Sequence, residues 1–100
     1  MKNRFSFKEE IWIYPSETAA WHFATLPKEQ AKKIKSVFGA NSRGFGSLPV
    51  SVTVGQTNWQ TSIFPEKRSE SYILPIKSEV RRKEGISAGD KVSFSLEIKI

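Results

Sequence analysis

The sequence Val92-Ser93-Phe94-Ser95-Leu96-Glu97-Ile98-Lys99-Ile100, at the C-terminal end of the chain, decides the fold class. Every even position of this stretch is apolar, and every odd position is serine, glutamate or lysine. Successive side chains of a β-strand point to opposite faces, so a period of two predicts a strand with one buried face. We therefore expect residues 92–100 to form one strand of a sheet that packs on the hydrophobic core.

The same alternation predicts five further strands. They cover residues 5–14, 21–26, 50–54, 59–64 and 72–76. Turn-forming residues at 15–18 join the first two strands as an antiparallel hairpin, and those at 55–58 join the next two. In the strand at 72–76, Pro75 predicts an edge position or a bulge, because proline has no N–H for a sheet hydrogen bond.

Two short helices interrupt the strands. The first is expected over residues 28–38, because Pro27 suits the first turn of a helix and the apolar residues recur at helical spacing. Gly39 is predicted to end it. The residues expected on its buried face are Ala31, Ile34 and Phe38. The second helix is expected from Glu79 to Glu84, with Ser78 as its N-terminal cap and Gly85 at its end.

These elements follow one another in the order ββαβββαβ. One-faced strands joined by short turns favour an antiparallel sheet, and closure of that sheet removes its exposed edges. The strict strand–helix alternation of a parallel nucleotide-binding sheet is absent. The predicted fold class is therefore mainly β: a closed six-stranded, largely antiparallel β-barrel with two short helices, in a single domain of residues 1–100.

The amino-acid composition excludes most types of catalytic site. The chain contains no cysteine, one histidine and one aspartate, which excludes disulfides, thiolate nucleophiles and cysteine-ligated metals. The histidine, His22, is expected to point away from the face of Trp21 and Phe23, with no aspartate or serine at a recognisable spacing. We therefore predict no catalytic residue, no metal and no cofactor, and an enzymatic activity is not favoured.

The chain carries 16 Lys and Arg against 10 Asp and Glu, a formal net charge of +6. Such a charge attracts polyanions, including nucleic acid, anionic lipid and phosphorylated metabolites, although a solvated basic surface is the alternative. The N-terminal region lacks the apolar core of a signal peptide, and no stretch is long enough to span a bilayer. We expect a cytoplasmic protein with no membrane partner.

Several short motifs, in this order and spacing, resemble the DUF1905 family of small bacterial domains of unknown function. The motifs are Trp21-His22-Phe23, Leu26-Pro27, Arg43-Gly44-Phe45-Gly46, Val50 to Gly55, Trp59 to Pro65, Tyr72 to Lys77, Val80-Arg81-Arg82 and Gly85 to Val92. The resemblance covers nearly the whole chain and implies a closed six-stranded barrel with no assigned activity. It also implies that some relatives carry a further domain linked to bacteriocin resistance, which has no counterpart in these residues.

The string Arg43-Gly44-Phe45-Gly46 matches the first half of an RNA-recognition-motif signature. The aromatic residue and valine of the second half are missing, and the element order βαββαβ of that fold is absent. A phosphate-binding glycine loop runs from a strand into a helix, whereas this segment runs from a helix into a strand. We interpret the segment as a turn that needs positive φ at Gly44 and Gly46, and leave the role of Arg43 open.

A cluster of cations begins the second predicted helix. Lys77 and Arg81 are four residues apart, where like charges on a helix repel by about 0.2–0.5 kcal/mol. Solvated helix charges are one explanation. The other is a bound anion, since arginine binds phosphate or carboxylate through two parallel hydrogen bonds. On this hypothesis the chain is a binding module for a small anionic ligand, and the ligand-binding residues are Arg43, Trp59, Thr61, Ser62, Lys77, Arg81 and Arg82.

The tryptophans Trp12, Trp21 and Trp59 have two possible roles, stacking on a flat ligand or packing in the core. We expect packing, with Trp21 and Trp59 sealing the end of the barrel, because large rings at strand ends commonly do so. Trp59 is also kept among the ligand-binding candidates at the predicted mouth of the barrel.

Weak, sequence-independent binding of nucleic acid is the alternative function. It would use the lysines of the first helix and the second-helix cluster on phosphates, and would fall steeply with added salt through counterion release. The protein is expected to be a monomer or a weak dimer, the latter through edge pairing of the strand that contains Pro75. The phosphate-binding candidates are Lys28, Lys32, Lys33, Lys35 and Arg81 to Lys83.

Overall fold

The computed structural model describes residues 3–15 and 20–100. The turn predicted at residues 15–18 lies, beyond Pro15, outside the described residues. The strands are β1 (Arg4–Glu10), β2 (Trp12–Pro15), β3 (Ala20–Thr25), β4 (Leu48–Val54), β5 (Thr57–Glu66), β6 (Ser71–Pro75) and β7 (Lys91–Ile98). The helices are α1 (Lys28–Phe38) and α2 (Ser78–Glu84), and two 3₁₀ turns, η1 (Gly39–Asn41) and η2 (Gly44–Gly46), follow α1.

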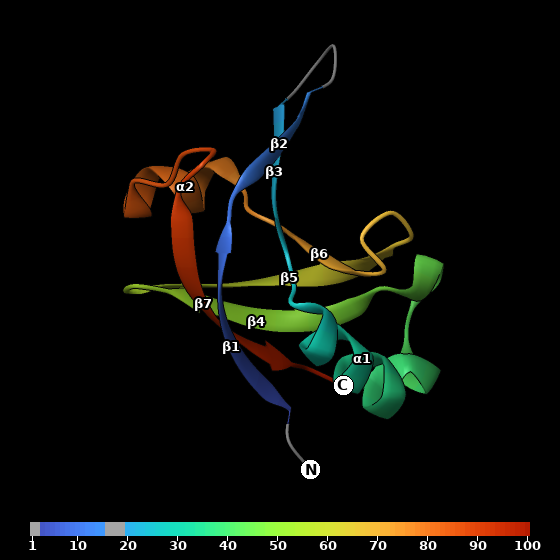
Figure 1. Ribbon diagram of the computed structural model, residues 1–100. Helices are drawn as coiled ribbons and strands as arrows, with labels where there is room; N and C mark the ends of the chain where they lie inside the picture. The colour runs from blue at the N-terminus through green and yellow to red at the C-terminus, as the bar shows by residue number, and fades with distance from the viewer. Residues whose placement is uncertain (1–2, 16–19) are drawn as a thin grey trace.

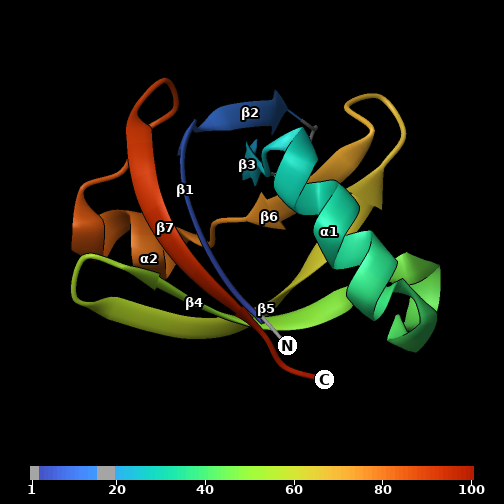
Figure 2. The same ribbon diagram turned by 60° about the horizontal axis from the view of Figure 1, so that its bottom comes forward.

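The described strands form one antiparallel sheet in the order β1-β7-β4-β5-β6-β3-β2. The sheet curves strongly, and α1 crosses the opening of the curve (Figure 2). Helix α2 lies on the opposite side of the molecule from the η1 and η2 turns in both views (Figures 1 and 2). The fold is mainly β with two helices, as predicted, and the sheet is an open half-barrel.

The closed six-stranded barrel is not confirmed, because the segment 5–14 forms two strands rather than one. The break is at Ile11, whose N–H donates to the carbonyl of Asp90 (2.9 Å) and whose carbonyl accepts from the N–H of Gly89 (2.8 Å). The Ile11 side chain is buried, so the chain bends there and changes partner from β7 to β3. Strands β1 and β2 therefore lie at the two ends of the sheet order although they are consecutive in sequence.

Strand β5 also changes partner along its length. Its first part pairs with β4 as far as Ile63, and its last three residues, from Phe64 to Glu66, pair with β6. The ladder between β5 and β6 ends at Ile73, after which β6 continues along β3. The two strands diverge from this point, which leaves a gap between the start of β5 and the end of β6.

Pro75 lies at this divergence and not on an edge strand, so the edge prediction is wrong. Strand β6 is flanked by β5 and β3, and Pro75 pairs with Phe23 of β3. The missing N–H costs no sheet bond there, because the β5 ladder has ended and the next N–H, that of Ile76, donates to the carbonyl of His22 (2.9 Å). The strand that was expected to mediate a weak dimer is therefore internal.

Helix α1 has the predicted bounds, and its buried residues are Ala31, Ile34 and Phe38, as predicted. The α-helix ends with Gly39 as its C-terminal cap, as predicted, but the φ of Gly39 is −57°, and the chain continues as the η1 turn to Asn41. In α2, Ser78 is the first helical residue and makes no capping bond, which corrects its predicted role. Gly85 ends α2 in the left-handed conformation, with φ of 64°, as predicted.

Strand β7 confirms the alternation of the C-terminal sequence. Phe94, Leu96 and Ile98 are buried, and Val92 packs at the edge of the same core. The strand ends at Ile98, so Ile100, expected inside, is 53% exposed. Among the described residues, no helix is long and apolar enough to cross a membrane.

Candidate anion-binding cleft

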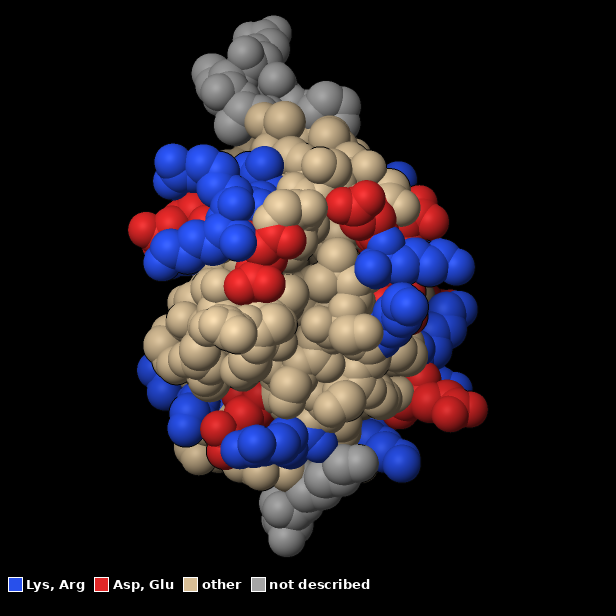
Figure 3. Space-filling view, turned by 90° about the vertical axis from the view of Figure 1, so that its left-hand side faces the viewer, with Lys and Arg blue, Asp and Glu red and all other residues tan. Residues whose placement is uncertain are grey.

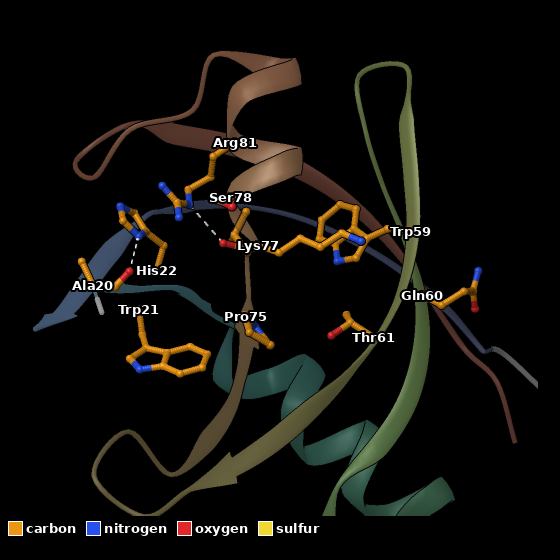
Figure 4. Close-up of a pocket in the computed structure, with 11 residues that line it drawn as sticks. Ala20, Trp21, His22, Trp59, Gln60, Thr61, Pro75, Lys77, Ser78 and Arg81 are labelled. Atoms are coloured by element: carbon orange, nitrogen blue, oxygen red, sulfur yellow. Dashed lines mark hydrogen bonds between the residues drawn. The ribbon is translucent and has the colours of Figure 1, made fainter. Parts of the chain in front are cut away.

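A cleft of about 300 Å³ occupies the gap where β5 and β6 diverge. One wall is β5 from Trp59 to Thr61, and the opposite wall is the end of β6 with the first turn of α2. The start of β3, from Ala20 to His22, forms the third side. The divergence of two sheet partners thus creates the cleft and places the first residues of α2 at its rim (Figure 4).

Arg81 is the cation of the cleft whose side chain donates a hydrogen bond to the backbone. Its Nε donates to the carbonyl of Ile76 (3.2 Å), which precedes α2, and its side chain is half-buried. The two Nη groups form no hydrogen bond or ion pair with the described residues. The guanidinium is therefore held at one edge, while the edge that arginine uses for bidentate binding of an anion remains free.

Lys77 and His22 complete the polar side of the cleft. The Lys77 side chain extends across it toward Trp59 (Figure 4). Its ammonium lies 3.6 Å from a carboxylate oxygen of Glu79, an exposed pair. His22 Nδ1 lies 3.1 Å from the carbonyl oxygen of Ala20. Because a carbonyl only accepts, this bond requires the proton on Nδ1 and leaves Nε2 free for a ligand.

The apolar side of the cleft is lined by the rings of two tryptophans and a proline. Trp59 is buried, with 6% of its surface exposed, whereas Trp21 is 55% exposed at the opening. Pro75 lies between them, and Thr61 of β5 also lines the cleft (Figure 4). None of the described residues that line the cleft is acidic. The lining is therefore cationic at one side and aromatic at the other, which suits an anion with an apolar part.

Four of the seven residues predicted from the sequence meet in this cleft: Trp59, Thr61, Lys77 and Arg81. Ser62 and Arg82 are neighbours of lining residues, but do not line the cleft themselves. Ser62 lies opposite Pro49 of β4, and Arg82 is exposed on α2.

Arg43 does not belong to the cleft, which corrects the prediction that it shares an anion with Arg81. It precedes the η2 turn, on the other side of the molecule from α2 (Figures 1 and 2). The glycine prediction is half correct: Gly46 has φ of 75°, but the second residue with positive φ is Phe45, at 61°, and not Gly44. The segment is a 3₁₀ turn, so it lacks the strand that an RNA-recognition motif requires.

Sequence reasoning missed His22 and Trp21 as lining residues. His22 was expected to point away from the face of Trp21 and Phe23 and was not counted among the ligand-binding residues, but the pairing of β3 with β6 brings it beside Ile76 and the start of α2. Trp21 was expected to seal the core and is instead largely exposed. The packing role is confirmed for Trp59, and Trp12 packs on Phe23 with ring centroids 4.9 Å apart.

The described residues hold no cluster of side chains that could bind a metal ion, and their group of shifted pKa lies outside the cleft. Among the described residues, no three His, Cys, Asp or Glu side chains come together as metal ligands. The one described group with a shifted pKa is Tyr72, whose burial raises the pKa of its hydroxyl, and it does not line the cleft. The cations that line the cleft are Lys77 and Arg81.

Comparison with known families matches residues 7–96 to the model described as Domain of unknown function (DUF1905). No curated protein matches the chain.

Proposed function

Since the chain belongs to the DUF1905 family, whose name assigns no activity, we propose a function from the cleft itself: non-catalytic binding of a small anionic ligand between β5 and α2. The observation that carries the proposal is the position of Arg81. Its Nε is tied to the carbonyl of Ile76, and its remaining donors have no partner among the described residues. A cation held in this way loses little rotational freedom when an anion binds.

The neighbouring groups supply further attraction. Lys77 adds a second positive charge, and its exposed pairing with Glu79 is weak enough to be exchanged for a ligand. His22 lies at the rim beside them, with its Nδ1 hydrogen-bonded to the carbonyl of Ala20. Carboxylate and phosphate are the groups that such a set of donors recognises best.

The size and charge distribution argue for a small ligand rather than a nucleic acid. The cleft volume of about 300 Å³ is at the lower end of small-molecule sites. On the face in Figure 3, Lys and Arg form separate groups with Asp and Glu among them, and no continuous cationic surface is present there. Helix α1, which carries the lysines, and helix α2 lie on different sides of the molecule (Figures 1 and 2), which weakens the alternative of phosphate-backbone binding through both.

The proposal is tested by NMR titration of the isotope-labelled protein with acetate, inorganic phosphate and citrate at constant ionic strength. We expect the Nε–H signal of Arg81 and the backbone signals of residues 75–81 to shift with at least one anion. Arg81→Gln should weaken binding about tenfold or more, since a hydrogen bond to a charged group contributes roughly 1.5–3 kcal/mol. Arg82→Gln, on the same helix but outside the cleft, and Arg43→Gln, on the far side, are the matched controls.

The proposal is wrong if none of these anions moves the Arg81 signal, or if Arg82→Gln and Arg43→Gln weaken binding as much as Arg81→Gln. A single-stranded oligonucleotide serves as the separate test of the alternative. Binding that falls steeply with salt and depends on Lys32, Lys33 and Lys35 would support nucleic acid instead.

A further inference from the structure

An apolar groove of about 620 Å³ lies on the surface of the sheet next to the cleft. It runs across β2, β3, β6 and the end of β5, and aromatic rings form most of its lining. These rings belong to Trp12, Tyr14, Trp21, Phe23 and Phe64. Tyr14 and Trp21 are each more than half exposed, and Phe64 is 38% exposed, so the rings form an accessible surface rather than part of the core.

Sheet register explains how the rings are aligned. Trp12 lies opposite Phe23, and Tyr14 lies opposite Trp21, so four rings from two strands share one face. The Trp12 ring, tilted by 34° against that of Phe23, is fixed further by a hydrogen bond from its Nε1 to the hydroxyl of Thr25 (2.9 Å). The surface is thus preorganised, which reduces the entropy lost when a ligand binds to it.

The groove and the cleft are continuous. Trp21, Thr61 and Pro75 line both of them. A ligand that reaches Arg81 in the cleft can therefore extend over Trp21 and Pro75 without leaving the protein surface. The positive charges are confined to the cleft end, because the only charged residue among those described along the groove is Glu66.

From this arrangement we propose that the ligand is an aromatic anion, with its carboxylate or phosphate at Arg81 and its flat ring system on Trp21 in the groove. This inference rests on the proposed function and specifies the class of ligand. Tryptophan faces and edges favour flat rings over flexible aliphatic chains through stacking, which adds to the burial of apolar area. Glu66 opposes a second negative charge at the far end, so the ligand carries its negative charge at one end only.

The test compares four probes: naphthalene carboxylate, its uncharged amide, octanoate and acetate. NMR shifts of the Trp21 indole N–H and the Arg81 Nε–H report the two ends separately. We expect naphthalene carboxylate to shift both signals and to bind about tenfold more tightly than octanoate or the amide. Acetate is expected to shift the Arg81 signal alone.

Variants separate the failure of this inference from the failure of the proposed function. Trp21→Ala should weaken naphthalene carboxylate about tenfold and acetate by a much smaller factor, and Trp21→Tyr should restore most of the affinity for naphthalene carboxylate. Phe45→Ala removes an exposed aromatic ring outside the groove and should change nothing. If Trp21→Ala has no effect, or octanoate binds as tightly as naphthalene carboxylate, the aromatic ligand is wrong but anion binding stands. If the amide binds as tightly as the carboxylate, or no probe shifts Arg81, anion binding itself fails.

Discussion

The hydroxyl of Thr57 donates a hydrogen bond of 2.5 Å to the carboxylate of Glu84, and this bond ties the end of α2 to the first residue of β5. Both side chains are half-buried. Strand β5 and α2 form opposite walls of the cleft, so the bond helps to fix their separation.

We expect Thr57→Val to lower the free energy of unfolding by about 1–2 kcal/mol, because it leaves a half-buried carboxylate without its donor. Thr57→Ser keeps the hydroxyl and is the matched control, with a smaller loss. Urea unfolding followed by tryptophan fluorescence measures both. Equal stability of the wild type and Thr57→Val would mean that water replaces the bond at no cost.

The same carboxylate limits what residue 55 can be. Gly55 has φ of 56°, and a Cβ there would overlap the Glu84 carboxylate. Gly55→Ala should therefore destabilise the fold by about 1–2 kcal/mol, both from the left-handed backbone and from displacement of Glu84. Gly44→Ala is the control, since its φ is not positive and a Cβ there meets nothing within 4 Å. Thermal unfolding should give a lower midpoint for the first variant and an unchanged or slightly higher one for the second.

Phe45 combines a left-handed backbone with a side chain that is 97% exposed. The ring therefore contributes little packing, and the backbone carries a cost that asparagine tolerates better. Phe45→Asn should raise the free energy of unfolding by about 0.5–1 kcal/mol in chemical denaturation. Phe45→Ala keeps the backbone cost and should change stability little. A loss of stability in Phe45→Asn would show that the ring packs on the fold after all.

The strands could be predicted from the sequence because their burial is local and periodic. The alternation from Phe94 to Ile98 predicts only a strand with one buried face, and the structure places all three inward residues in the core. The bend at Ile11 could not be predicted, because an apolar residue satisfies a strand and a buried bend equally well. Its backbone partners, Gly89 and Asp90, come from the far end of the sequence.

The candidate site could be predicted in part for the same reason. Lys77 and Arg81 are one helical turn apart, so local geometry alone brings them together. His22 could not be placed beside them, since that depends on the non-local pairing of β3 with β6. Arg43 was placed wrongly because charge and glycine content carry no information about the side of the sheet on which a loop lies.

Burial of Tyr72 links stability to alkaline pH. Desolvation raises the pKa of its hydroxyl above the ordinary value of 10.0, so the folded state keeps this proton at pH values where the unfolded chain has lost it. The contribution to stability is complete below the unfolded pKa and is lost as the pH rises through the folded pKa.

Tyr72→Phe removes this titration and should flatten the fall of the unfolding free energy above pH 10.0, measured by urea unfolding across that range. Tyr14→Phe, at a tyrosine that is 53% exposed, is the control for the loss of a tyrosine hydroxyl outside the core. Parallel curves for the wild type and Tyr72→Phe would mean that the hydroxyl of Tyr72 ionises in the folded protein as it does in the unfolded chain.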